Sequence, residues 1–449
     1  MKKRINSLLI FIITFLCVSI VLNMTEDTRN NGYIDKNCVD EFFDLKTSST
    51  TMSCEWNLTW GGADFNEYAS AIAIDTMGNI YITGIRSLGV EQSLLLVKFN
   101  NSGDHEWDNV LGDFNWGGSD VVVDSKNNLY VLGNNHSSMY STITYLIKYN
   151  SDGIMQWNRS YSSGGHDLGN GLTIDANDNI YIVGYTDHGH YDYDVLLVKY
   201  NSLGEQLWNN SWGGIGTQEG ESVELDSLNN VYVTGHNGSG DTNNDIILIK
   251  FDNTGTFQWN FTWSNDYFER GMDLALDSLD NIYVSGRTGS LIPDTQNMVL
   301  IKFNNSGQQL WNRTWGGSGQ DYGTSIEIDS SDNVIIGGNT YSFGLGQADT
   351  ALVCYNNVGV QLWNYTWGGT GYDYSTSIEI DSSNNLFNTG RTGSFGLTSY
   401  DLFIIKYNLI QVVTDGGKIP FGQYYSIFLI ISVISLIIVQ KRKLRKIFQ

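Results

Sequence analysis

Carboxylate side chains recur at one position of this chain, and carboxylate oxygens are ligands that calcium prefers. Each member of the set lies eight residues before an Asp that ends an alternating apolar and polar segment. The set is Glu67, Asp167, Glu269, Asp321 and Asp373. If the segments meet around one axis, the five carboxylates predict a shared ligand site that holds calcium. Hydrogen bonding of each carboxylate to neighbouring backbone is the alternative interpretation.

Five of the six histidines fall in or beside connections that differ from one part of the chain to the next. They are His136, His166, His188, His190 and His236, with Asp187, Asp192 and Asp194 close to the third and fourth in sequence. Imidazole nitrogens together with carboxylates bind transition metals, so these residues are candidate ligands of such an ion. Solvated polar loops are the alternative.

Three arginines occupy equivalent places, immediately after a short apolar strand. They are Arg86, Arg287 and Arg391. The planar guanidinium binds carboxylate or sulfate through two parallel hydrogen bonds, so these side chains are candidates for holding an anionic ligand. Isolated surface charges would contribute little, which is the alternative interpretation.

A sequence motif that occurs seven times defines the elements that position these residues. One copy is Trp311-Asn-Arg-Thr-Trp-Gly-Gly317, and we call the motif the Trp phrase. The copies begin at Trp56, Trp107, Trp157, Trp208, Trp259, Trp311 and Trp363, which are 50 to 52 residues apart. A repeat of this length built from short strands is typical of a propeller blade. The Trp that opens each copy and the residue four positions later, which is Trp in five copies and Leu111 or Tyr161 in the others, share one face of a strand. This predicts packing between blades rather than ligand binding.

The sixth repeat shows the strands of one blade. Alternating residues predict strands over Thr324–Asp329, Asn333–Gly338, Thr350–Tyr355 and Leu362–Trp367. No Trp phrase follows the last third strand, which ends at Tyr407, whereas a spare copy precedes the first repeat at Trp56–Trp60. The sequence therefore predicts an all-β fold, a seven-bladed β-propeller closed by an N-terminal outer strand.

The two ends of the chain indicate export and anchoring. Residues 1–23 carry Lys2-Lys3-Arg4 and an apolar run, which predicts a signal peptide or signal anchor. The remaining predicted divisions are a polar linker at 24–55, the propeller at 56–408, a linker at 409–420, a transmembrane helix at 421–440 and a basic cytoplasmic tail at 441–449. The expected location is the cell membrane, with one C-terminal span and the propeller outside the cell.

Composition and modification signals agree with an exterior location. The formal charge of −23 argues against a nucleic-acid partner. Asn-x-Ser/Thr signals on the outermost strands predict N-glycosylation at Asn57, Asn158, Asn209, Asn260, Asn312 and Asn364. Export would also permit a disulfide between Cys38 and Cys54. Cys354 stands where other repeats carry Lys and is predicted to be a lone buried thiol.

The repeated phrase resembles the SBBP beta-propeller repeat family. The resemblance rests on Trp-Asn-x-Thr-Trp-Gly-Gly, on Ser-Ile-x-Ile-Asp-Ser-x-Asn-Asn-Ile-Tyr-Val-Thr-Gly, and on Asp-x-Leu-Leu-Val-Lys-Tyr-Asn, and it extends from Trp56 to about residue 408. These repeats occur in exported prokaryotic and archaeal proteins. The resemblance implies a seven-bladed propeller at the cell surface and no shared catalytic residues.

Function is expected on the face that carries the variable loops. Connections between second and third strands, such as 85–93 and 134–142, differ in almost every residue, and variable loops on a rigid scaffold are where binding normally occurs. The leading hypothesis is a surface module that binds a glycan or a protein. The alternatives are an extracellular carbohydrate-active enzyme (a lyase or glycosidase), a quinone-dependent dehydrogenase, and a structural component of a surface layer.

Overall fold

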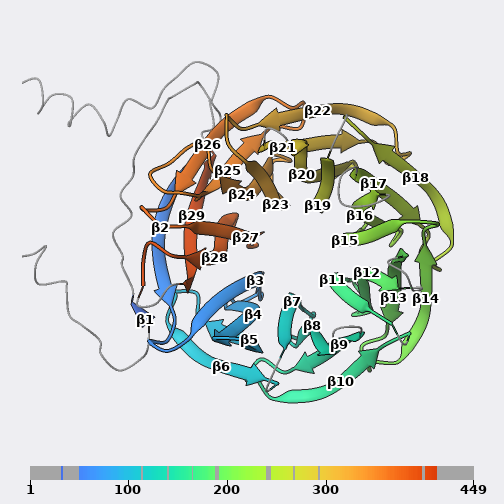
Figure 1. The fold of residues 1–449 in the computed structure, drawn as a ribbon, viewed down its shortest axis with the longest axis horizontal. Helices are drawn as coiled ribbons and strands as arrows, with labels where there is room; N and C mark the ends of the chain where they lie inside the picture. Colours follow the sequence, from blue (N-terminus) through green and yellow to red (C-terminus); the bar gives the residue numbers. More distant parts are fainter. Residues whose placement is uncertain are drawn as a thin grey trace, which may run out of the picture.

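A computed structural model describes residues 32–33, 50–112, 115–138, 141–163, 165–187, 192–238, 244–265, 268–291, 294–396 and 400–411. All regular structure in these ranges is β-strand. Antiparallel pairing joins the strands in groups of four, and the groups surround a common centre (Figure 1). The all-β propeller predicted from the repeat is confirmed.

The strands nearest the centre are β3 (Asn66–Ile74), β7 (Trp116–Val123), β11 (Asp167–Ile174), β15 (Thr217–Leu225), β19 (Phe268–Leu276), β23 (Asp321–Ile328) and β27 (Asp373–Ile380). The second strands are β4 (Ile80–Leu88), β8 (Leu129–Ser138), β12 (Ile180–Asp187), β16 (Val231–Gly238), β20 (Ile282–Leu291), β24 (Val334–Thr340) and β28 (Asn385–Thr392). The second strand of each blade runs antiparallel to the first.

The third strands are β5 (Glu91–Phe99), β9 (Ser141–Tyr149), β13 (Tyr193–Tyr200), β17 (Asn244–Phe251), β21 (Asp294–Phe303), β25 (Asp349–Tyr355) and β29 (Asp401–Gln411). The outermost strands are β6 (His105–Leu111), β10 (Met155–Tyr161), β14 (Gln206–Trp212), β18 (Phe257–Trp263), β22 (Gln309–Trp315), β26 (Gln361–Trp367) and β2 (Thr50–Trp60). A short strand, β1 (Gly32–Tyr33), pairs with the end of β2.

The outer strand from the N-terminal side pairs with the last strand of the propeller. β2 runs antiparallel to β29, with Trp60 opposite Leu402 and Trp56 opposite Lys406. This is the pairing that the missing last Trp phrase predicts. The strand begins at Thr50 rather than Trp56, because backbone pairing continues beyond the phrase into the segment that the sequence assigns to a linker.

Apolar clusters lie between neighbouring blades. One of them combines Tyr81 and Leu94 of one blade with Val121 and Ile147 of the next, and Trp107 packs against it. The Trp rings meet buried tyrosines at an angle, as Trp311 and Tyr283 do with centroids 5.9 Å apart. The interpretation of the Trp phrase as packing between blades agrees with these contacts.

A polar network at the first turn of each blade fixes the other face of the scaffold. The Asp277 carboxylate accepts hydrogen bonds from the backbone N–H of Leu279 and Asn281 and from the Tyr283 hydroxyl. Lys302 Nζ lies 3.3 Å from the same carboxylate. Asp280 has a φ of 58° in the turn, a conformation that Asn and Asp tolerate. These repeated Asp residues therefore hold tight turns together.

The sixth blade keeps the turn aspartate, Asp329, but has apolar groups in place of the lysine and the tyrosine of this network. Cys354 stands where Lys302 stands in the fifth blade, and Ile335 stands where Tyr283 does. Cys354 is a free, fully buried thiol, and burial raises its pKa. The expected lone buried thiol is therefore found, in a position where a lysine would have had no tyrosine hydroxyl to contact.

Residues 1–23 and 421–440 lie outside the described residues. Within the described part of the chain, there is no helix with the length and apolar character needed to cross a bilayer.

Candidate functional site

A cavity of about 450 Å³ opens at the centre of the propeller. Its lining includes Ser70, Asn170, Glu221, Thr324 and Thr376, which come from different inner strands. Each of these residues is an extra, unpaired residue at a β-bulge in its strand. A bulge re-aims the side chains around it, and here it directs them toward the channel.

In each blade, the residue two positions before the bulge lies opposite a residue of the second strand. We call these cross-strand pairs together the rim of the channel. The pairs are Tyr68–Ile85, Gly117–Asn134, Leu168–Tyr185, Glu219–His236, Arg270–Arg287, Tyr322–Asn339 and Tyr374–Arg391. Side chains opposite each other on antiparallel strands are close enough to interact. The rim therefore differs in chemistry from blade to blade although its backbone repeats.

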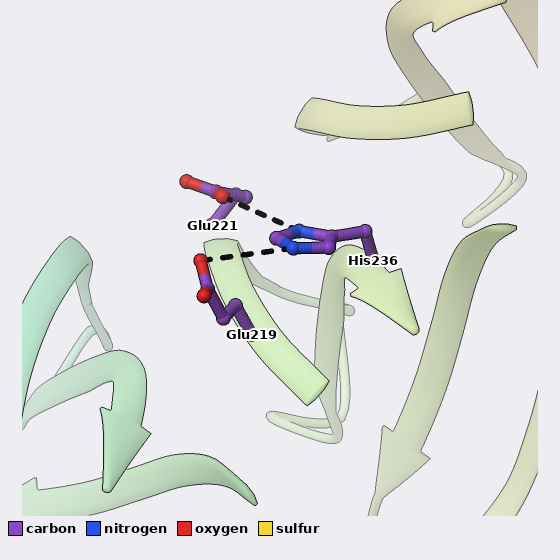
Figure 2. Close-up of side chains that lie close together, drawn as sticks. All are labelled: Glu219, Glu221 and His236. Carbon is purple, nitrogen blue, oxygen red and sulfur yellow. Dashed lines mark ion pairs between the residues drawn. The ribbon is translucent and has the colours of Figure 1, made fainter. Parts of the chain in front are cut away.

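One side of the rim carries two acidic groups and an imidazole together (Figure 2). His236 Nε2 lies 3.7 Å from a Glu219 oxygen, and His236 Nδ1 lies 3.7 Å from a Glu221 oxygen. We call these three residues the Glu–Glu–His cluster. Arg270 contacts both carboxylates, at 3.3 Å from Glu219 and more closely at Glu221.

Burial shifts the pKa values in this cluster in opposite directions. Burial, together with the charges of Arg270 and Arg287, lowers the pKa of His236 to about 3, so its imidazole is neutral at pH 7. Burial raises the pKa of Glu219 to about 7, against the opposing effect of Arg270 and with help from Glu221. A neutral imidazole beside carboxylates can accept a proton or bind a metal ion.

The opposite side of the rim is rich in tyrosine and contains Arg391. The guanidinium carbon lies 5.1 Å from the ring centre of Tyr68, 4.7 Å from Tyr374 and 5.0 Å from Tyr400. Tyr372 stacks on Tyr374 with an angle of 10° between the rings, and the Tyr341 and Tyr374 hydroxyls are 2.9 Å apart. We call the set the Tyr–Arg surface; its members are Tyr68, Tyr322, Tyr341, Tyr372, Tyr374, Arg391 and Tyr400.

The five carboxylates singled out in the sequence do not converge on the channel. All five are fully buried, and each belongs to a local network. Asp321, for example, accepts hydrogen bonds from the Thr340 hydroxyl, the Ser342 hydroxyl and the Gly317 backbone N–H. Asp373, Asp167, Glu269 and Glu67 are likewise paired at the start of their own strands, which corrects the expected position of these side chains beside the channel. Their contacts correspond to the structural alternative.

The three arginines separate into two situations. Arg391 belongs to the Tyr–Arg surface, and Arg287 lies over Phe268 and Tyr322, with 4.8 Å and 5.9 Å to the ring centres. Arg86 is one residue later in register, opposite Glu67, and forms a 3.1 Å ion pair with it. The structure thus brings two of the three arginines to the tyrosines of the rim.

The candidate histidines that the structure describes form two separate groups. His136 Nδ1 and His166 Nδ1 lie 3.0 Å and 3.2 Å from the hydroxyl of Thr142, which joins them. Burial lowers the pKa of His136. His236 lies with Glu219 and Glu221 in the fourth blade, whereas His188 and His190 lie outside the described residues.

Below the rim, the channel contains carboxylates that the sequence reasoning missed. Asp120 and Asp273 lie directly after the bulges of their strands and form one level along the channel. Two residues further along equivalent strands, a second level is formed by Glu224, Glu327 and Glu379. Burial raises the pKa of Asp120 to about 7 and those of Glu224 and Glu379 to about 8, and neighbouring carboxylates add to each shift. Aligning the inner strands at their bulges would have found both levels.

The remaining predicted sites lie away from the rim. Five of the six candidate glycosylation asparagines are exposed on outer strands; Asn57 is half-buried. Cys54 takes part in a disulfide, while its predicted partner Cys38 lies outside the described residues. The pairing and the glycosylation both stay predictions.

Comparison with known proteins agrees with the fold. An uncharacterized WD repeat-containing protein, L264 of Acanthamoeba polyphaga mimivirus, is 23% identical over 401 residues, and the match covers 69% of this chain and 27% of that protein. The WD40 domain of Neurospora crassa Pan2 is similar in structure, with a TM-score of 0.50, 11% identity, and coverage of 77% of this chain and 90% of that chain.

The polysaccharide lyase Uly1 is similar to the same degree. Its structure matches with a TM-score of 0.50 and 9% identity, covering 79% of this chain and 91% of that chain. Likenesses at this level of identity concern the fold alone. At the level of sequence, residues 162–192 match the family model described as SBBP, beta-propeller repeat. The chain therefore carries an SBBP beta-propeller repeat, and the resemblance predicted from the Trp phrase is confirmed.

Proposed function

We propose that this protein is a membrane-anchored, seven-bladed propeller at the cell surface that binds an acidic glycan through the Tyr–Arg surface. Export by residues 1–23 and anchoring by residues 421–440 are parts of this proposal, which rest on the sequence pattern. The β2–β29 pairing supports closure of the ring. A closed scaffold holds the rim rigidly, which favours binding because little ordering is needed.

The observation that carries the proposal is the arrangement around Arg391. Its guanidinium is enclosed by the rings of Tyr68, Tyr374 and Tyr400, and Tyr341 is 39% exposed beside them. Tyrosine offers a large amphipathic contact surface at a low cost in conformational entropy, which suits the apolar faces of sugar rings. A guanidinium binds a carboxylate or sulfate through two hydrogen bonds. The combination favours an acidic sugar over a neutral one.

A protein ligand on the same surface is the first alternative, since tyrosine and arginine are also enriched where proteins bind one another. A lyase is the second. Glu219, His236 and Tyr185 have shifted pKa values and lie close to Arg270 and to Glu221, which lines the cavity. Acid, base and cationic groups of this kind are common at catalytic sites.

A glycan array probed with the purified full chain tests the proposal. We expect binding to sulfated or uronate-containing polysaccharides and little binding to neutral glycans. Absence of binding to every acidic glycan would contradict the proposal. Incubation with each bound polysaccharide distinguishes the lyase alternative, because cleavage by elimination leaves unsaturated sugar ends that absorb ultraviolet light, whereas a binding module leaves the polymer intact.

A further inference from the structure

We propose that Glu219, Glu221 and His236 bind a divalent transition-metal ion of the zinc type. The site lies across the rim from the Tyr–Arg surface, and the proposal does not depend on glycan binding. One ligand atom from each residue lies within 4.8 Å of the others. One imidazole nitrogen with two carboxylate oxygens is a ligand set that zinc accepts.

Local backbone geometry explains why the three side chains meet. Glu219 lies directly opposite His236 in the pairing of β15 with β16. Glu221 is the bulge residue between Gly220 and Ser222, so the bulge re-aims its side chain. Both carboxylates thereby face the same imidazole from β15, one toward each ring nitrogen (Figure 2).

A second observation, independent of the carboxylates, points to a ligand. His236 is 3% exposed, and its Nδ1 atom has no hydrogen-bond partner among the described residues. A buried polar atom without a partner is costly, and a bound ion would satisfy it. His136 and His166 differ from His236, because neither is fully buried and both contact the Thr142 hydroxyl.

The metal would compete with Arg270 for the carboxylates. Arg270 Nε lies 2.9 Å from a Glu221 oxygen, and its terminal nitrogen contacts Glu219 at 3.3 Å. The Arg270 side chain is 27% exposed, so it has room to turn toward solvent when an ion binds. Removing this positive charge should therefore tighten metal binding.

Geometry also sets what the bound ion would face. Tetrahedral zinc with bonds of about 2.0–2.2 Å holds neighbouring ligand atoms about 3.3–3.6 Å apart, close to the 3.7 Å between His236 Nδ1 and the Glu221 oxygen. The Glu219 oxygen lies 3.7 Å from the other ring nitrogen, so the Glu219 side chain would turn toward an ion held at Nδ1. Three protein ligands leave a fourth position open. Because Glu221 lines the central cavity, that position would face the cavity and hold water or a ligand's oxygen atom.

Zinc binding to the full chain, measured by calorimetry, tests this inference. We expect one ion per chain, with affinity reduced at least about 100-fold in Glu221→Gln and in His236→Gln, and increased several-fold in Arg270→Gln. The matched control is a variant with His136→Ala and His166→Ala, which should bind zinc as the wild type does. Loss of binding in the control with retention in His236→Gln would overturn the assignment.

A measurement on the wild type guards against variants that fail to fold. X-ray absorption of the zinc-loaded full chain should show one imidazole together with oxygen ligands at about 2.0–2.2 Å. A shell with two or more imidazoles, or with none, would contradict the Glu–Glu–His cluster as the site. Absence of stoichiometric binding to the wild type would also overturn the proposal, and it would leave the result of the glycan array unaffected.

Discussion

Replacing Asp277 with Ala is expected to lower the free energy of unfolding by about 3–5 kcal/mol, the range observed when one member of a buried ion pair is removed. The substitution leaves Lys302, whose side chain is 8% exposed, without its 3.3 Å carboxylate partner. It also removes the acceptor for the backbone N–H groups of Leu279 and Asn281. Chemical denaturation of the variant, monitored by tryptophan fluorescence, measures the loss.

The sixth blade supplies the matched control for this prediction. Asp329 accepts the equivalent backbone hydrogen bonds from Ser331 and Asn333, but Cys354 stands in the place of the lysine. Asp329→Ala should therefore cost only the turn hydrogen bonds, about 1–3 kcal/mol. Equal losses in the two variants would show that the buried lysine makes no difference and would contradict the account of this network.

The channel carboxylates should make the protein more stable at pH 5 than at pH 8. Burial raises the pKa of Glu224 and Glu379 from 4.5 to about 8, and that of Asp120 from 3.8 to about 7. A carboxyl group whose pKa is higher in the folded than in the unfolded protein makes its full contribution to the free energy of unfolding below about pH 4. That contribution is lost as the pH rises through about 8. Each pKa unit corresponds to about 1.4 kcal/mol, and because neighbouring carboxylates raise one another's pKa, the separate shifts do not add and we expect a total of about 4 kcal/mol.

Thermal unfolding between pH 4 and pH 9 measures this effect. The melting temperature should fall by roughly 5 °C or more between pH 5 and pH 8. The double variant Glu224→Gln, Glu379→Gln should flatten the profile and be more stable than the wild type at pH 8. A wild-type profile that rises from pH 5 to pH 8 would contradict the prediction.

The turn carboxylates limit this stabilisation at lower pH. For Asp124, Asp175, Asp226 and Asp277, burial acts to raise the pKa, but hydrogen bonds from the turn amides outweigh it and the pKa is lowered. Their contribution is present above the unfolded pKa and is lost as the pH falls below about 4. The two sets of carboxylates together predict a stability maximum near pH 5.

The fold was predictable because its determinants are local and repeated. Alternation of side chains, the Asp-initiated turns and the Trp phrase each specify one strand or turn, and each returns in every blade. Strand ends were less accessible to sequence reasoning. β2 starts at Thr50 because it pairs with Gln411, and that partner lies at the other end of the propeller.

The rim could not be assembled from sequence for two physical reasons. A bulge changes which residues face the channel, so Asp321 points into its blade whereas Thr324 lines the cavity. Partners also come from distant repeats. Arg391 on β28 meets Tyr68 on β3 because these two strands lie side by side although they are far apart in the sequence, and no local spacing records that contact.

Residues with a recognisable type were found more readily than their partners. Arg287, Arg391 and His236 were identified from their chemistry and their position after a strand. Glu219 and Glu221 were missed because their importance depends on the register that places Glu219 opposite His236. Register follows from backbone pairing and becomes visible only in the folded blade.

The most direct test of the central claim is the affinity of the Arg391→Ala variant for the acidic polysaccharide selected on the array. Removing the guanidinium between Tyr68, Tyr374 and Tyr400 should weaken binding at least about tenfold, as expected for loss of a charge-assisted contact. The matched control is Arg313→Ala, because Arg313 also lies over an aromatic ring, 5.2 Å from that of Trp311, but on an outer strand. We expect weaker binding in Arg391→Ala alone; wild-type affinity in Arg391→Ala would contradict the role of the Tyr–Arg surface in binding.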